Sequence, residues 1–225
     1  MYSSRIVRSA TQINDAMLAV YGHMTLAIVT SMIVSALIGY NHAAMALLFG
    51  TPLKWVVIFA PLAAIFGISM ALNSNPSRPV AVAMLHGFAA LMGLSFSSIF
   101  VVYTLGSIWS AFAGAAILFG TMTFYGYFTK RSLDSMGQFM FVGLIAVIIV
   151  SLVNLWLQSS VVQMVVSALA VIIFTGLTAY DTQKIREEVT YETDNGTAEI
   201  RGALTLYLDF INLFLSLLHL FGDRK

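Results

Sequence analysis

The sequence predicts an all-α membrane protein whose helices cross the bilayer seven times. Of its 225 residues, 59% are hydrophobic and 9% are charged, whereas an average soluble domain is about half apolar and carries roughly a quarter charged residues. The apolar runs are also too long and unbroken to leave a helix or strand with one polar face. Both observations indicate that a lipid bilayer surrounds the chain.

The lengths of the apolar runs predict where the helices lie, because a spanning helix needs about 20 predominantly apolar residues. In chain order the predicted spans are 17–39, 54–72, 80–104, 108–128, 138–158, 161–180 and 203–221. Residues 1–16 are expected to form an N-terminal segment in the cytoplasm, and residues 17–225 a single transmembrane domain. The longest connection, 182–202, has the composition of a solvated loop and is too short to fold as a separate domain. Any function is therefore expected among the helices.

Small residues at every fourth position let helix backbones approach closely in lipid. The spacing occurs at Ser31, Ser35 and Gly39 in the first span, and at Ala63, Gly67 and Ala71 in the second. We expect these faces to pack within the chain.

The basic residues predict the orientation, because cytoplasmic loops hold an excess of lysine and arginine. With the N-terminus in the cytoplasm, the inner side holds Arg5, Arg8, Arg78, Lys130, Arg131, Lys184, Arg186 and Arg201, and the outer side holds Lys54, Arg224 and Lys225. Trp55, Trp109 and Trp156 then lie at outer helix ends, where tryptophan is enriched. The two C-terminal cations favour an alternative in which the seventh span turns back, giving six spans and a re-entrant segment.

Several classes of function have no support in the composition. The net charge is +1 without a dense basic block, so a nucleic-acid partner is not expected. The absence of cysteine excludes disulfides, thiolate metal sites and a cysteine nucleophile. The sequence contains no zinc-protease motif of the form HExxH. We expect neither an enzyme nor a bound cofactor or resident metal.

Two aspartates at membrane depth are the candidate functional residues, because carboxyl groups there are costly and mark ion paths, proton relays or structural pairs. Asp181 closes the sixth span and Asp209 lies inside the seventh. Helical spacing places Asp209 in one polar stripe, which consists of Thr205, Asp209, Asn212, Ser216 and His219. The candidate supporting residues are Thr178, His86, Thr205, Asn212, Ser216 and Arg78.

If Asp181 and Asp209 approach each other, they would exchange protons as a unit, and the charge of the site would change with pH. When both are ionised, their oxygens suit a hard cation such as calcium. The alternative for Asp181 alone is an ordinary interfacial residue at a helix end. Two membrane aspartates would also suit an intramembrane aspartyl protease, but Asp209 lacks the Gly-x-Gly-Asp pattern of that class.

Four segments resemble the signatures of the Bax inhibitor (transmembrane Bax-inhibitor-motif) family. They are LTAYDTQK at 177–184, GALTLYLDFINLFLSLL at 202–218, AALMGLSFSSIF at 89–100 and YGYFTKR at 125–131. The resemblance covers nearly the whole chain and points to the bacterial inner-membrane members, whose N-terminal segment is short. It implies six helices around a central C-terminal seventh helix and a pH-sensitive calcium leak.

By the same resemblance, Asp181 and Asp209 match the family's proton-sensing aspartate pair. The family also has an arginine that latches onto the pair when the pore is closed. That position corresponds here to Asn75 or a near neighbour, and Arg78 is the arginine that would replace it. Where many members have a glutamate in the third span, this chain has Met92.

The sequence therefore leaves two functions open. The first is a pH-sensitive calcium leak channel or exchanger, in which protons gate the aspartate pair and calcium is the transported ion. The second is a membrane regulator that binds a quality-control protease or a stress-response protein, as the resemblance also permits.

Overall fold

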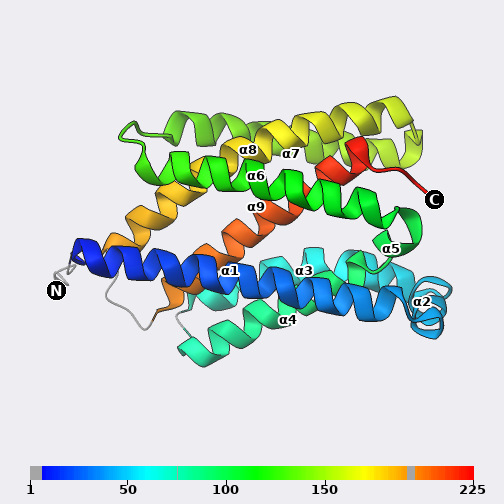
Figure 1. The fold of residues 1–225 in the computed structure, drawn as a ribbon, viewed down its shortest axis with the longest axis horizontal. Coiled ribbons are helices and arrows are strands. Elements are labelled where there is room, and N and C mark those ends of the chain that lie inside the picture. The colour runs from blue at the N-terminus through cyan, green and yellow to red at the C-terminus, as the bar shows by residue number, and fades with distance from the viewer. Residues whose placement is uncertain (1–6, 75, 192–195) are drawn as a thin grey trace. The chain divides into compact units, whose positions relative to one another are not determined.

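The chain is helical throughout the part that the structure describes. The computed structural model describes residues 7–74, 76–191 and 196–225, and no β-strand occurs among them. The helices are α1 (Ala10–Gly39), α2 (His42–Phe49), α3 (Leu53–Asn73), α4 (Arg78–Phe96), α5 (Ile99–Val102), α6 (Leu105–Phe128), α7 (Asp134–Leu157), α8 (Ser160–Tyr191) and α9 (Thr197–Phe221), as Figure 1 shows. The all-α prediction is confirmed.

Seven membrane-spanning candidates occur in the described part of the chain, as predicted, with α4 and α5 counted together as Arg78–Val102. The last of them, α9, runs without interruption for 25 residues, which is about 37 Å at 1.5 Å per residue. That length is sufficient for a full crossing, so the seventh segment has no need to turn back within the bilayer.

The first helix begins at Ala10, earlier than the predicted residue 17. A reciprocal cap starts it: the Gln12 amide N–H donates to Ser9 Oγ at 3.3 Å, and the Ser9 amide N–H donates to Gln12 Oε1 at 2.9 Å. Such a capping box satisfies two backbone donors that would otherwise lack partners. A count of apolar residues misses this polar first turn. Residues 1–6, including Arg5, lie outside the described residues.

The predicted loop 182–202 is wrong over most of its length, because α8 continues to Tyr191 and α9 begins at Thr197. Glutamate, lysine and arginine are good helix formers. The two helix ends are joined by an ion pair, in which Arg201 Nη2 lies 2.6 Å from Glu188 Oε1. Composition alone cannot distinguish such a charged helix extension from a solvent-exposed loop. Residues 192–195, including Asn195, lie outside the described part.

Two further boundaries differ from the prediction. The short helix α2 was not predicted; its first turn is capped by Asn41, whose Oδ1 accepts from the Ala44 amide N–H at 3.0 Å. The third span is broken after Phe96, where Ser97 Oγ donates to the Leu94 carbonyl at 2.6 Å. Hydroxyl groups that bond the preceding turn compete with the helical ladder.

The chain forms two compact units, which we describe separately. The first comprises Met1–Tyr103, Glu187–Tyr207 and Lys225, and the second comprises Thr104–Arg186 and Leu208–Arg224. The single transmembrane domain expected for residues 17–225 stays a prediction. Both α8 and α9 contribute residues to each unit.

Within the first unit, α1 packs against α4. A side-chain carbon added to Gly93 of α4 would lie 2.7 Å from the Ser31 carbonyl oxygen, so only glycine permits this approach of the two backbones. The predicted small-residue face is thus a packing face in α1. The corresponding prediction for α3 is wrong, since a carbon added to Gly67 would meet nothing within 4 Å.

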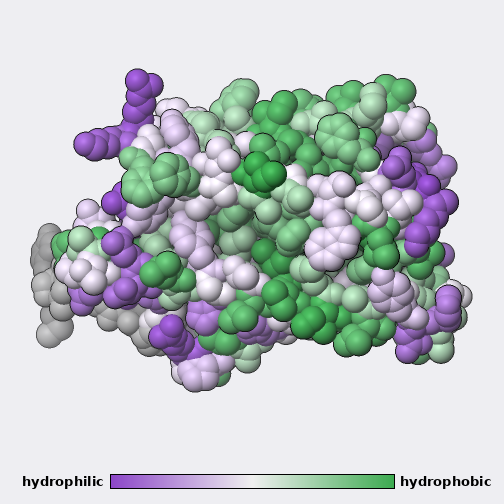
Figure 2. Space-filling view, viewed as in Figure 1, coloured by the Kyte–Doolittle hydropathy of each residue, from purple (hydrophilic) through white to green (hydrophobic). Residues whose placement is uncertain are grey.

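The outward-facing side chains along the helices are mostly hydrophobic, and hydrophilic ones gather near helix ends (Figure 2). Trp55, Trp109 and Trp156 lie near helix ends and are 57%, 59% and 80% exposed. The most buried span is α9, with 61% of its apolar window enclosed, against 6% for α7. That burial fits a central helix, but the central position itself stays a prediction.

Candidate functional site

Asp181 lies on α8 in the second unit, between close contacts with two other helices. A side-chain carbon on Gly126 of α6 would clash with the carbonyl of Ala179, and one on Gly137 of α7 would clash with the ring of Tyr180. Small residues that let backbones touch are the usual device of helix packing in lipid. The two glycines therefore hold α6 and α7 against the turn of α8 that carries Asp181.

The residues that follow Asp181 fix the end of this turn to the α6–α7 connection. Gln183 accepts a hydrogen bond from the Leu133 amide N–H at 2.9 Å and donates one to the Arg131 carbonyl at 2.9 Å. Lys184 Nζ lies 2.7 Å from Asp134 Oδ1. The position of Asp181 is thus set from both sides.

Asp209 lies on α9, also in the second unit, and is only 4% exposed. Its carboxyl group is within hydrogen-bonding reach of the carboxyl group of Asp181. The other oxygen, Oδ2, is buried and has no hydrogen-bond partner among the described residues. The next residue, Phe210, packs edge-on against the rings of Phe112 and Phe119. The two candidate aspartates are therefore adjacent in an apolar environment.

This arrangement limits the chemical states of the pair. An ionised carboxylate only accepts hydrogen bonds, so a hydrogen bond between two carboxyl groups requires a proton on one of them. Two negative charges at this separation in a medium of low dielectric constant would repel strongly. The repulsion can be relieved by a shared proton, which leaves the pair with one negative charge, or by a cation between the carboxylates.

The predicted supporting residues near the pair bond to their own helices. Each donates to the carbonyl four residues earlier: Thr178 to Phe174, Thr205 to Arg201, Asn212 to Leu208 and Ser216 to Asn212, at 2.7–3.2 Å. Such bonds satisfy a polar side chain inside a membrane. Within the described part of the chain these four side chains bond to helix carbonyls and not to either carboxyl group, so their supporting role stays a prediction.

The remaining candidates, Arg78 and His86, belong to the first unit. His86 Nδ1 lies 2.9 Å from Thr30 Oγ1, which joins α4 to α1. Arg78 is the first residue of α4 and is exposed. Asn75, the position expected for the latch, lies outside the described residues. The latch therefore stays a prediction.

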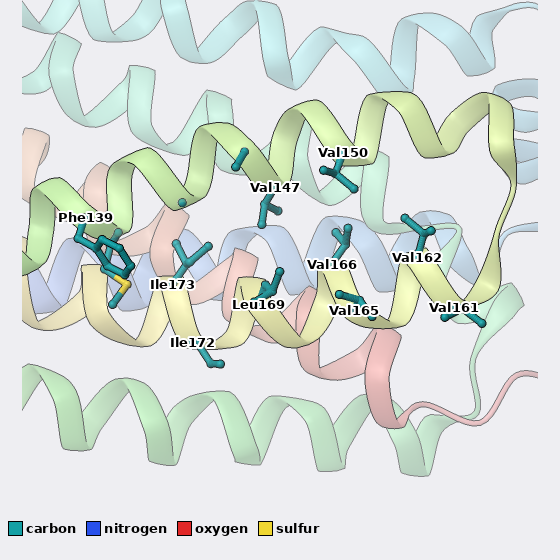
Figure 3. A pocket seen from close by; sticks show the side chains of 13 residues that line it. Phe139, Val147, Val150, Val161, Val162, Val165, Val166, Leu169, Ile172 and Ile173 are labelled. Carbon is teal, nitrogen blue, oxygen red and sulfur yellow. The ribbon is translucent and has the colours of Figure 1, made fainter.

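The second unit also contains an apolar groove between α7 and α8, with a volume of about 490 Å³. Figure 3 shows Val147 and Val150 of α7 facing Val162 and Val166 of α8 across it. All of its lining side chains are apolar, so it offers no group to bind an ion. The described residues also contain no cluster of three or more histidine, aspartate or glutamate side chains that would hold a resident metal.

Sequence reasoning missed two buried polar groups. Ser31 Oγ lies 2.7 Å from the hydroxyl of Tyr207 and donates to the Ala89 carbonyl at 2.7 Å, which joins α1, α4 and α9. Glu199, which the prediction placed in the solvated loop 182–202, is 6% exposed and lies in the first turn of α9. An acidic residue favours a helix N-terminus, and this signal could have indicated the earlier start of α9.

Together the fold and the pair define a polytopic helical membrane protein with an acidic site enclosed among its spans. The profile of the family described as "inhibitor of apoptosis-promoting Bax1" matches residues 13–225. The chain belongs to this family, the Bax inhibitor family, as its signatures indicated.

Relatives of nearly full length support this assignment. The inner membrane protein YbhL of Escherichia coli is 42% identical over 229 residues, covering 99% of this chain and 97% of the relative. An uncharacterised protein of Borreliella burgdorferi is 38% identical over 217 residues, covering 94% and 93%. One from Rickettsia prowazekii is 37% identical over 212 residues, covering 93% and 89%.

Proposed function

We propose that this protein is a pH-sensitive cation leak channel or exchanger, with calcium as the transported ion and the Asp181–Asp209 pair as its gate. The observation that carries the proposal is the adjacency of two carboxyl groups, half-buried Asp181 and buried Asp209, within membrane-spanning helices. Ionisable groups at membrane depth are expensive to keep, and they mark ion and proton pathways.

Protons and calcium would compete for this pair. Calcium takes six to eight oxygen ligands, among which carboxylates are preferred. With two carboxylates available, the site would attract the ion; with a shared proton, the attraction falls. Asp209 is enclosed in the present arrangement, so conduction requires a movement that opens the pair to water. The structure therefore supports a gate in its closed state.

The test is calcium entry into proteoliposomes that contain an indicator dye, measured at two pH values. Asp181→Asn and Asp209→Asn keep the shape of the side chain but fix its charge, so each should abolish the difference between the two pH values. Asp15 on α1 is an exposed carboxylate, and Asp15→Asn is the matched control that should behave as wild type. Flux with unchanged pH dependence in Asp209→Asn would exclude the gate.

The location and orientation follow from separate observations. The Escherichia coli relative is an inner membrane protein, and this and the seven apolar spans support a bacterial inner membrane as the location. The excess of lysine and arginine in one set of connections supports a cytoplasmic N-terminus.

The description of the family as an inhibitor favours a second candidate, a regulator that binds a membrane protease or a stress-response protein. In this case the carboxyl pair would only hold α8 and α9 together. Crosslinking in intact cells should then capture one reproducible partner, and Asp209→Asn should reduce that capture without any ion flux in proteoliposomes.

A further inference from the structure

A second buried carboxylate, Glu199, lies at the start of α9 in the first unit. Its Oε1 accepts a hydrogen bond from Arg8 Nη1 at 3.1 Å, and the side chains are only 8% and 18% exposed, respectively. The Arg8 amide N–H also donates to the Thr190 carbonyl at 3.0 Å. Arg8 therefore connects the residues before α1 to the end of α8 and the start of α9.

A second arginine approaches the same carboxylate. A side-chain carbon placed on Gly196 would lie 2.9 Å from Glu199 Oε2 and 3.3 Å from Arg78 Nε, so both groups flank one glycine. Gly196 has a φ of 83°, a conformation that glycine adopts without strain. Next to it, Thr197 Oγ1 donates to the Pro76 carbonyl at 3.2 Å. The start of α9 thus lies against the residues that precede α4.

The second carboxylate oxygen of Glu199 can accept a hydrogen bond from this second arginine. Its Oε2 is buried and has no hydrogen-bond partner in the described part of the chain. Another titratable group of the first unit, His23, is within electrostatic reach of Glu199, Arg78 and His86. The nearest cation on α9, Arg201, is already paired with Glu188. The arginines available to Glu199 are therefore Arg8 and Arg78.

We propose that Glu199 is a positioning residue, which pairs with Arg8 and Arg78 to fix the N-terminal end of α9 and, through this helix, Asp209. This proposal rests on the proposed function for its effect on flux. Asp209 follows ten residues later on the same continuous helix, about 15 Å at 1.5 Å per residue. Since Asp209 is enclosed here, the clamp holds the closed arrangement.

The first experiment measures the clamp without ion flux. The chain contains no cysteine, so Val7→Cys and Thr190→Cys report by disulfide formation whether the N-terminal segment stays at the end of α8. Glu199→Gln, which keeps the side-chain volume, should lower the crosslinking yield. Asp15→Asn is the matched control, because Asp15 is an exposed carboxylate on α1. An unchanged yield in Glu199→Gln would overturn the clamp.

The second experiment measures calcium flux at the pH where the wild-type protein is closed. Glu199→Gln and Arg8→Gln should each raise the flux by at least about fivefold, the lower end of usual coupling between sites. The combined variant should show no more flux than Glu199→Gln alone, since Glu199→Gln already removes the contact with Arg8. Arg8→Lys should keep wild-type flux.

Three results would overturn the positioning role. These are unchanged flux in Glu199→Gln despite lost crosslinking, additive effects of the two neutral variants, and a shifted pH midpoint, which would make Glu199 part of the gate itself. If the wild-type protein passes no calcium at any pH, the proposed function fails, and crosslinking alone decides whether Glu199 holds α9.

Discussion

The junction of Ser31, Tyr207 and the Ala89 carbonyl gives a stability prediction: Tyr207→Phe should destabilise the wild-type protein but stabilise the Ser31→Ala variant. Ser31 and Tyr207 are 2% and 0% exposed, so water cannot replace a lost partner. Ser31 Oγ has a single proton, which it donates to the Ala89 carbonyl at 2.7 Å, and the Tyr207 hydroxyl then donates to Ser31 Oγ at 2.7 Å. The edge of one ring in the Phe88–Tyr207 pair faces the other ring, with centroids 6.0 Å apart.

Tyr207→Phe removes one hydrogen bond and leaves Ser31 bonded to Ala89. Such bonds between membrane helices contribute about 0.6 kcal/mol on average and at most about 1.7 kcal/mol, and this loss is the expected destabilisation. Ser31→Ala instead leaves the Tyr207 hydroxyl buried without a partner, whereas the Ala89 carbonyl, inside α4, keeps its helical bond from the Gly93 amide. Such an orphan costs about 1–3 kcal/mol, so Ser31→Ala should be the more damaging change.

The double variant tests whether the orphaned Tyr207 hydroxyl causes the loss of stability. In Ser31→Ala with Tyr207→Phe the hydroxyl orphan is gone, so the protein should be more stable than Ser31→Ala alone. The assay is equilibrium unfolding in mixed micelles, followed by far-ultraviolet circular dichroism. Ser151→Ala is the matched control, because Ser151 bonds only the Val147 carbonyl of its own helix. A double variant less stable than Ser31→Ala would refute the hydrogen-bonded junction.

Two other predictions test packing and orientation. Gly93→Ala should destabilise the protein by about 1–3 kcal/mol, the usual cost of overpacking, because the added carbon would lie 2.7 Å from the Ser31 carbonyl. Gly67→Ala is the control and should be neutral, because its added carbon meets nothing within 4 Å. Equal stabilities of the two variants would contradict this prediction. In intact cells, a single cysteine replacing Thr51 should react with an impermeant maleimide, whereas one replacing Lys130 should react only after permeabilisation; the reverse pattern would exclude a cytoplasmic N-terminus.

The number of spans could be predicted from the sequence because it depends on one physical quantity, the length of apolar chain that the bilayer requires. The helix ends could not, because they depend on polar contacts that are local or distant. The early start of α1 rests on the cap between Ser9 and Gln12. The extension of α8 to Tyr191 is joined to α9 by Glu188 and Arg201, which are 13 residues apart.

The carboxyl pair could also be anticipated, since aspartate in an apolar run stands out in any sequence. The clamp could not, because Glu199 lies in a stretch where charges are common, and its partner Arg8 is 191 residues away. Nothing in the local sequence distinguishes this glutamate from the exposed Glu188. Only the fold, which encloses one and exposes the other, separates them.

The hydrogen-bonding capacity of each side chain explains why so few polar residues of α9 need a partner on another element. Thr205, Asn212 and Ser216 carry a donor, and each gives it to a carbonyl of its own helix. An ionised aspartate or glutamate has no donor, and the N–H groups inside a helix are already taken by the helical ladder. Asp209, in the middle of the helix, therefore has to find a proton or a cation on another element, whereas Glu199, in the first turn, pairs with Arg8. The acceptor-only side chains of a spanning helix are thus the ones that must form a site, and α9 has two, one facing an acid and one facing an arginine.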